Sequence, residues 1–129
     1  MGLDRVSGVK NSLNIEPNFP IITVGGTNGK GSVCAFLEEI YSKAGYSVGC
    51  YTSPHLFKFN ERIKINSEQV NDETILKSLD LVNTKKKSIE LTYFEITTLA
   101  AMNIFIGKKN RYSYSRGRSR GKAGCGKYI

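Results

Sequence analysis

The sequence predicts an α/β fold, in which one domain carries helices on the faces of a parallel β-sheet. Three observations predict it. Two short segments rich in apolar and β-branched residues, 20–26 and 46–53, are typical of strands buried on both faces. The stretch between them repeats apolar residues at helical spacing. A further apolar segment, 93–106, has no helix breaker and suits a helix packed on more than one side.

The first strand is expected at 20–26, where PIITVGG ends in two glycines. A helix follows from Gly31 and ends at Gly45, a typical C-terminal stop. Its apolar stripe consists of Val33, Phe36, Leu37, Ile40, Tyr41 and Ala44. The second strand, 46–53, completes a βαβ unit, whose crossover should be right-handed.

Beyond the second strand, residues 54–61 are neither helical nor alternating in pattern, and we expect an ordered loop there. A short strand is expected at 62–66. A helix then starts at the acidic residues after Asn71. Its apolar face consists of Ile75, Leu76, Leu79 and Val82. The helix at 93–106 needs a sheet to cover it.

The net charge of +8 comes entirely from the end of the chain. Residues 1–107 hold 11 basic and 11 acidic side chains, whereas 108–129 hold 8 basic and none acidic. The three cysteines are widely spaced, with no metal-binding pattern around the single histidine, which is typical of reduced thiols in a cytosolic protein. Because no signal peptide or membrane-length apolar run is visible, we expect a cytoplasmic protein without a membrane partner.

The segment GTNGKGS, residues 26–32, predicts an anion site between the first strand and its helix. Gly26, Gly29 and Gly31 allow the backbone to approach phosphate oxygens, and the helix N-terminus adds partial positive charge. Lys30 can reach terminal phosphates, and the Ser32 hydroxyl can bind Mg²⁺. The general P-loop spacing is not met, since Gly31 separates the lysine from the serine. The alternative is a turn whose glycines serve tight packing only, but such a turn has no use for a central lysine.

Three motifs in order over residues 2–107 carry a family resemblance: VGGTNGKGSVCAFL, GYSVGCYTSPHLFKFNERIKIN and LTYFEITTLAA. Together they resemble the N-terminal part of folylpolyglutamate synthase/dihydrofolate synthase, in the Mur-ligase-like superfamily. The resemblance implies a P-loop NTPase-like central domain, truncated here, with ATP and Mg²⁺ as cofactors. It also implies a ligase that activates a folate or dihydropteroate carboxylate as an acyl phosphate, which the amine of L-glutamate then attacks.

The resemblance also implies roles for individual residues. The ATP-binding residues would be Gly26, Thr27, Asn28, Gly29, Lys30, Gly31 and Ser32, with Lys30 catalytic. Ser53 and Ser32 would bind the metal. The loop from Ser53 to Arg62 resembles the family's mobile loop at the folate site. The folate-binding residues would be Gly2, Leu3, Pro54, His55, Thr92, Tyr93, Phe94 and Glu95.

Several of these residues have a simpler interpretation. Ser53 and Pro54 could merely end a strand. A lone loop histidine such as His55 is more often a surface or packing residue, and we assign it no catalytic role. Glu95 could be a carboxylate that stabilises a helix start. Phe57 and Phe59 could stack on a pterin ring or could cover the edge of a core.

Residues 110–129 form a basic tail that resembles an arginine- and tyrosine-rich RNA-binding segment. Residues 1–109 would then be the N-terminal part of the ATP-binding domain. An alternative function is therefore a nucleotide-binding domain with a basic RNA-binding tail. Steep salt-dependent RNA affinity that is lost with the tail would favour it.

The family resemblance implies something different at this position: a third buried strand and glycine turn, of the type I-D-I-V-I-V-E-V-G-L-G-G-R-L-D-A-V-N. One permitted back-translation of residues 110–128, read from its second base, encodes that peptide. Lys108, Lys109 and Asn110 can be encoded by a run of adenines, where a one-base slip is easy. We therefore expect 110–129 to be a disordered frameshift product with no selected function, and nucleic acid not to be a partner.

A chain of this length spans about a quarter to a third of a family member. We therefore expect no ligation by this polypeptide alone, and aggregation where the helix at 93–106 lacks cover. The remaining alternative is a gene product with no function or partner. The intact enzyme is expected to be a monomer that binds folate or dihydropteroate and L-glutamate.

Overall fold

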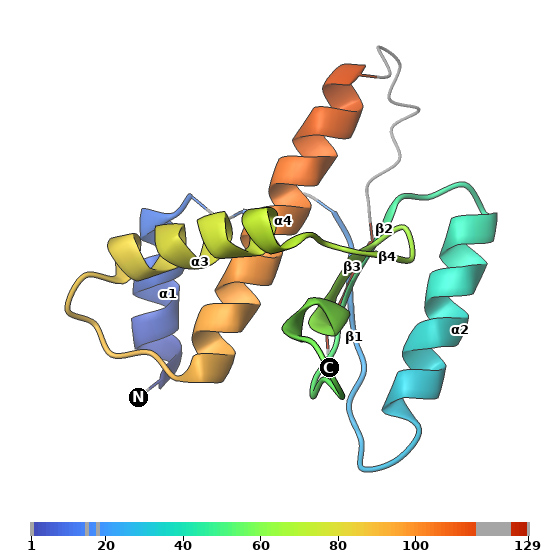
Figure 1. Ribbon diagram of the computed structural model, residues 1–129, viewed down its shortest axis with the longest axis horizontal. Coiled ribbons are helices and arrows are strands. Elements are labelled where there is room, and N and C mark those ends of the chain that lie inside the picture. The colour runs from blue at the N-terminus through green and yellow to red at the C-terminus, as the bar shows by residue number, and fades with distance from the viewer. Residues whose placement is uncertain (1, 15, 18, 116–124, 129) are drawn as a thin grey trace.

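The computed structural model describes residues 2–14, 16–17, 19–115 and 125–128, with the side chains of residues 4–14, 16–17 and 19–108. Five strands form one sheet in the order β1-β5-β2-β3-β4. Their bounds are β1 Ile21–Thr23, β2 Val48–Tyr51, β3 Ile63–Ile65, β4 Glu68–Gln69 and β5 Cys125–Tyr128. Helix α2 (Lys30–Lys43) lies on one side of the sheet, and α1 (Gly2–Ser12), α3 (Asp72–Lys86) and α4 (Tyr93–Ser115) lie on the other (Figure 1). The α/β class predicted from the sequence is confirmed.

The sheet is mixed, however, and the expectation of a wholly parallel sheet is wrong. Strands β1, β5 and β2 run parallel, whereas β3 is antiparallel to β2 and β4 to β3. The reversal between β3 and β4 occurs at Asn66 and Ser67, whose φ angles of 52° and 69° suit a two-residue hairpin turn. The Asn66 side chain also accepts a hydrogen bond from the Val48 amide, which ties the turn to the start of β2.

Helix α2 begins and ends where the glycines predicted, but its apolar stripe does not face the sheet. Gly29 is the N-cap at φ 77°, and Gly45 follows the helix at φ 91°. The stripe residues Phe36 and Ile40 are 70% and 61% exposed, while Cys34 is buried. The expected stripe is therefore wrong as a core face, because no described helix packs against that side of α2.

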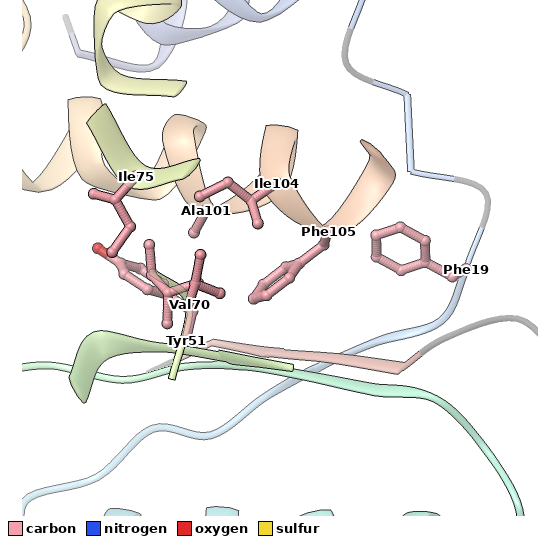
Figure 2. Close-up of a cluster of buried hydrophobic side chains, with 8 residues drawn as sticks. Phe19, Tyr51, Val70, Ile75, Ala101, Ile104 and Phe105 are labelled. Carbon is pink, nitrogen blue, oxygen red and sulfur yellow. The ribbon is translucent and has the colours of Figure 1, made fainter. Parts of the chain in front are cut away.

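Helix α4 fulfils the prediction that it packs on more than one side. One face meets the sheet in a cluster with Tyr51, Val70 and Ile75, to which it contributes Ala101, Ile104 and Phe105 (Figure 2). Its other face, at Leu99 and Ala100, packs with Val9 of α1 and Val82 of α3. The expectation that this helix lacks cover is therefore wrong, since α1 and α3 supply it.

Four elements were not predicted: α1, the short 3₁₀ helix Phe59–Arg62, β4 and β5. Helix α1 forms over Gly2–Ser12 and buries Val9, although its signal was present in the spacing of Val6, Val9 and Leu13. Helix α4 extends to Ser115, and Cys125–Tyr128 form strand β5 between β1 and β2. Residues 110–115 of the predicted tail thus continue α4 and 125–128 form β5, whereas residues 116–124 and 129 lie outside the described residues.

Candidate functional site

The glycine turn between β1 and α2 is held open by backbone conformations that favour glycine. Gly26 and Gly29 have φ angles of 137° and 77°, which side-chain-bearing residues rarely adopt. A Cβ placed on Gly26, Gly29 or Gly31 would meet no atom within 4 Å. The glycines therefore do not serve close packing here, which removes the alternative interpretation of this turn.

This turn forms one wall of a cavity of about 470 Å³. Thr27, Asn28, Gly29, Lys30 and Gly31 line it from the turn. Cys34, Ala35 and Glu38 line it from α2, and Cys50, Thr52, Ser53, Pro54 and Lys64 from the strands and their ends. The fold thus brings Ser53 and Pro54 to the glycine turn, although they are more than twenty residues away in sequence. Gly26 and Ser32, by contrast, do not line this cavity.

The electrostatics of the turn suit an anion. The first turn of α2 contains no acidic residue, and Gly29 provides no side-chain cap for its free amides. The Val33 amide donates to the Gly29 carbonyl at 3.0 Å, so the amides before it point out of the helix start. Lys30 is half-buried beside them. Amide groups, the helix dipole and one ammonium group therefore converge on this end of the cavity.

Two charged residues of the cavity were missed by the sequence analysis. Lys64 lies on β3 directly across from Cys50 of β2, another lining residue. Glu38 lies one turn beyond Cys34 on α2, and its Oε2 atom is buried with no hydrogen-bond partner among the described residues. For Lys64 a signal existed, because it alternates with Ile63 and Ile65. Glu38 gave none, because only the packing of α2 decides which side it faces.

The oxygen donors near the cavity fit a hard divalent cation such as Mg²⁺. The Ser53 hydroxyl and the Glu38 carboxylate line it, and Ser32 lies exposed in the first turn of α2 outside it. The part of the chain that the structure describes holds no group of three or more His, Cys, Asp or Glu side chains arranged around one point. A cation here would thus need oxygen ligands from a bound phosphate as well.

The loop that follows Ser53 is organised around one carboxylate. Glu61 accepts hydrogen bonds from the backbone amides of Leu56, Phe57 and Lys58 at 3.0, 2.8 and 2.7 Å. These bonds, that of Lys58 above all, lower the pKa of Glu61 to about 2. The loop ends in a short 3₁₀ helix, Phe59–Arg62.

This loop meets the start of α4 through an aromatic and basic cluster. The Arg62 guanidinium carbon lies 5.5 Å from the ring centroids of both Phe59 and Tyr93. Its Nε donates to Nδ1 of His55 at 2.8 Å, and the His55 ring lies 6.0 Å from that of Phe59. The fold therefore brings His55 and Tyr93, two predicted folate residues, onto the same arginine. Phe59 packs against the core, whereas Phe57 is almost fully exposed.

The start of α4 has the second carboxylate that the sequence singled out. Thr92 and Glu95 form a reciprocal pair: the Thr92 amide donates to Glu95 Oε1 at 3.1 Å, and the Glu95 amide donates to Thr92 Oγ1 at 3.2 Å. These bonds lower the pKa of Glu95, and Arg5 of α1 adds to the effect. Glu95 therefore does stabilise a helix start, yet its Oε2 remains buried without a partner in the described part of the chain.

The effect of Arg5 on Glu95 shows that the beginning of α1 lies near the beginning of α4. The backbone of Gly2 and Leu3 belongs to α1, and the Leu3 side chain lies outside the described residues. Tyr93 and Phe94 are both exposed. The predicted site thus has two parts, the cavity at the glycine turn and an aromatic surface at the start of α4, and loop 54–62 connects them.

No described helix is both long and apolar enough to cross a membrane.

Searches of known proteins point to one group of enzymes. The dihydrofolate synthase/folylpolyglutamate synthase of Haemophilus influenzae is 43% identical over 106 residues, which are 81% of this chain and 24% of that protein. No family model matches the sequence. The chain thus spans about a quarter of the length of the curated relatives it matches.

Solved structures agree with the sequence matches. The structure of Escherichia coli FolC in complex with DHPP and ADP has a TM-score of 0.81 at 33% identity, over 99% of this chain and 28% of that chain. A bifunctional folylpolyglutamate synthase/dihydrofolate synthase from Yersinia pestis, complexed with AMPPNP and Mn ion, has a TM-score of 0.80 at 33% identity. This match covers 99% of the present chain and 28% of the Yersinia chain.

Proposed function

Since the chain is related in sequence and fold to part of the dihydrofolate synthase/folylpolyglutamate synthases, we propose that it is the nucleotide-binding part of an ATP-dependent amide ligase. The observation that carries the proposal is the cavity that joins the glycine turn to Ser53. In the proposed reaction, a folate or dihydropteroate carboxylate oxygen takes the γ-phosphoryl group of ATP and ADP leaves. The amine of L-glutamate then displaces phosphate, loses a proton and forms the amide.

The glycine turn would hold the ATP phosphates. Its residues 26–32 present free helix amides, and Lys30 would neutralise charge on the transferring phosphoryl group. Related structures hold ADP, or AMPPNP with Mn ion, which supports a nucleotide and a divalent cation as ligands. The likeness to P-loop NTPases is supported by the position of the turn, which joins β1, one of the three parallel strands, to helix α2.

Mg²⁺ would be held by the hydroxyls of Ser53 and Ser32, together with phosphate oxygens. When bound, it would offset the charge that builds up on the phosphates. Ser53 is supported by its place in the cavity wall, and Ser32 by its place in the first turn of α2. Glu38, with its unpartnered oxygen, is an additional candidate for a contact through water.

The second substrate would bind beside loop 54–62, with its flat ring on the aromatic surface at the start of α4. Exposed Tyr93 and Phe94 supply faces for a pterin, and the unpartnered Glu95 oxygen supplies an acceptor for its N–H groups. Thr92, Pro54 and His55, with Gly2 and Leu3, would complete the binding surface. The relative that binds DHPP supports a ligand of this class.

The nucleotide site is tested by calorimetric titration of the 129-residue chain with AMPPNP and Mg²⁺. Lys30→Ala should weaken binding by about tenfold or more, because a charge-assisted contact contributes roughly 1.5–3 kcal/mol. The control is Lys43→Ala, which removes the same charge from an exposed pair with Glu39 at the far end of α2. Equal affinity of the Lys30→Ala variant and the unaltered chain would end the proposal.

We also propose that the sequence after about Lys109 comes from a shifted reading frame. The position between β1 and β2 has parallel neighbours on both sides, where a continuous apolar strand is usual. The chain places CGKY (125–128) there, whereas the shifted frame encodes the apolar segment IDIVIVEV further upstream, from the codon of Asn110 onward.

Sequencing the source DNA across codons 108–110 tests this second proposal. A slip within the adenine run, followed by a frame that continues like the relatives, is expected. A verified frame that encodes residues 110–129 as given, with no shifted segment behind it, would refute it.

The 129-residue chain alone should not ligate glutamate, since it spans about a quarter of its relatives. We expect no amide product and no ADP release from it in a coupled assay, whereas the frame-restored protein should be active. Turnover by the purified 129-residue chain would contradict this. Side chains of the basic tail lie outside the described residues, and no observation favours the RNA-binding alternative.

A further inference from the structure

We propose that Arg62 receives the carboxylate of the second substrate and holds it beside the phosphates of the nucleotide. This inference rests on the proposed function and adds a residue to it. Arg62 was not among the predicted site residues, although it ends the loop 53–62 that resembles the family's mobile loop at the folate site, because the sequence does not show which way its side chain points. Its contacts in the structure do.

The guanidinium group of Arg62 is held in place on three sides. The rings of Phe59 and Tyr93 contact each other edge to face, with centroids 6.3 Å apart, and each centroid lies 5.5 Å from the guanidinium carbon. The Nε–H donates to His55 Nδ1 at 2.8 Å. Two cation–π contacts and one directional hydrogen bond therefore restrict the motion of the group, so that less entropy is lost when a ligand binds it.

The same group is left without a charge partner. Among the described residues, no carboxylate lies within 4.0 Å of it, and its two terminal amino groups have no hydrogen-bond acceptor. The Nδ1 atom of His55 accepts a hydrogen bond from Arg62 as part of a neutral ring, so this contact does not balance the positive charge of the arginine. The neighbouring carboxylate, Glu61, is occupied by three backbone amides. A planar fork of free donors is the group that proteins use to bind a carboxylate through two hydrogen bonds.

Arg62 also lies at the boundary between the two parts of the site. Its carbonyl accepts a hydrogen bond from the Thr52 amide at 2.8 Å, and Thr52 lines the cavity at the glycine turn. Its guanidinium meets Tyr93, which belongs to the aromatic surface. A substrate with a flat ring on that surface and a carboxylate at its other end would therefore pass the arginine on its way to the phosphates. There a cation would offset the repulsion between two anions.

The test compares two ligands that differ only in this carboxylate: pteroate, and the same molecule with its carboxylate converted to a neutral amide. The 129-residue chain and its variants are titrated with each by fluorescence. The unaltered chain should bind pteroate about tenfold or more tightly than the amide, and Arg62→Gln should abolish that preference while the amide binds as before. Arg62→Lys, which keeps the charge but loses the planar fork, should keep part of the preference.

The matched control is Lys58→Gln, which removes a cation from the same loop at an exposed position. It should leave the preference for pteroate unchanged. If Arg62→Gln weakens both ligands equally, the arginine only orders the loop and the inference is wrong. It is equally wrong if the unaltered chain does not distinguish the two ligands. A fold check by circular dichroism accompanies each variant, and Arg62→Lys still decides the question if Arg62→Gln fails to fold.

Titration with AMPPNP and Mg²⁺ separates this inference from the proposed function. Arg62→Gln should bind AMPPNP like the unaltered chain, and Lys30→Ala should retain the preference for pteroate. If the unaltered chain binds AMPPNP but does not prefer pteroate to its amide, the role of Arg62 alone is overturned. A preserved preference in a chain that ignores AMPPNP would overturn the nucleotide site alone.

Discussion

Single residues carry much of the organisation of the site. Glu61 is fully used as an acceptor for three amides of its own loop, and this is what distinguishes it from Glu38 and Glu95, each of which keeps a buried oxygen without a described partner. An ionised carboxylate that accepts from three amides is a structural element, whereas a buried carboxylate oxygen without a partner needs a water, an ion or a ligand group to satisfy it. Residues of one type at the same site thus have different roles, set by their hydrogen bonds.

The order of loop 54–62 should depend on pH through Glu61. Its pKa falls from 4.5 to about 2 in the folded chain, so the ionised form stabilises the loop above pH 4.5 and this stabilisation is lost as the pH falls towards about 2. Glu61→Gln should remove the effect and expose the amides of Leu56, Phe57 and Lys58. Hydrogen exchange of these amides, corrected for its intrinsic pH dependence, measures it. Glu73→Gln, which only breaks an exposed pair with Lys77, should not change their protection.

Gly49 is the glycine that close packing requires. A Cβ on it would lie 2.7 Å from Cδ1 of Phe105, a buried side chain of α4. Gly49→Ala should therefore lower the free energy of unfolding by about 1–3 kcal/mol, the usual cost of overpacking. The control is Gly107→Ala. Gly107 lies on α4, the helix that carries Phe105, and has open space around it, so this substitution should raise the free energy of unfolding by up to about 1 kcal/mol. Urea unfolding followed by circular dichroism compares them, and equal effects would show that Phe105 moves aside freely.

At the scale of elements, local sequence signals determine where helices start. Helix α3 has an N-cap, Asn71, whose side chain accepts from the Thr74 amide at 2.9 Å, and two acidic residues follow it. Helix α4 has the reciprocal pair of Thr92 and Glu95. Helix α2 has neither, and its free amides are what the proposed nucleotide site uses. An uncapped start of α2, in a chain that caps α3 and α4, is consistent with a ligand in that place.

Removal of the cap of α3 gives a test at this scale. Asn71→Ala should lower the free energy of unfolding by about 1 kcal/mol, because one helix amide loses its acceptor. Asn83→Ala is the matched control, since Asn83 is exposed in the interior of the same helix, where alanine is the better helix former. Thermal unfolding of both variants measures the difference. A control variant that is as destabilised as Asn71→Ala would show that the cap is not the cause.

At the scale of the whole molecule, the two faces of the sheet are covered unequally. Helices α3 and α4 bury one face, with α1 packed on these two helices, whereas α2 is the only described helix on the other side (Figure 1). Val33, Phe36 and Ile40 of α2 are exposed. β1 is also an edge strand of the described sheet. An exposed apolar stripe on a helix and an open sheet edge each favour association.

The 129-residue chain should therefore self-associate through α2. The double substitution Phe36→Glu and Ile40→Glu should shift the chain towards monomer in sedimentation velocity, because charge makes burial of this stripe unfavourable. Leu76→Glu is the control, since Leu76 is exposed to a similar degree on α3, away from that stripe. Persistent association of the double variant, or dissociation by the control, would place the contact elsewhere.

The sequence by itself determined several of the elements and the glycine turn. Strands 20–26 and 46–53, the helix starts near Asn71 and Tyr93 and the anion-binding segment 26–32 all follow from residues close together in the chain, whose propensities and hydrogen bonds are local. Tertiary structure alone decided the rest. The antiparallel β3, the exposure of Phe36, the presence of Glu38 and Lys64 in the cavity and the stacking of Arg62 on Tyr93 depend on partners far away in sequence. Local spacing cannot specify such partners, because burial and pairing are properties of the packed chain.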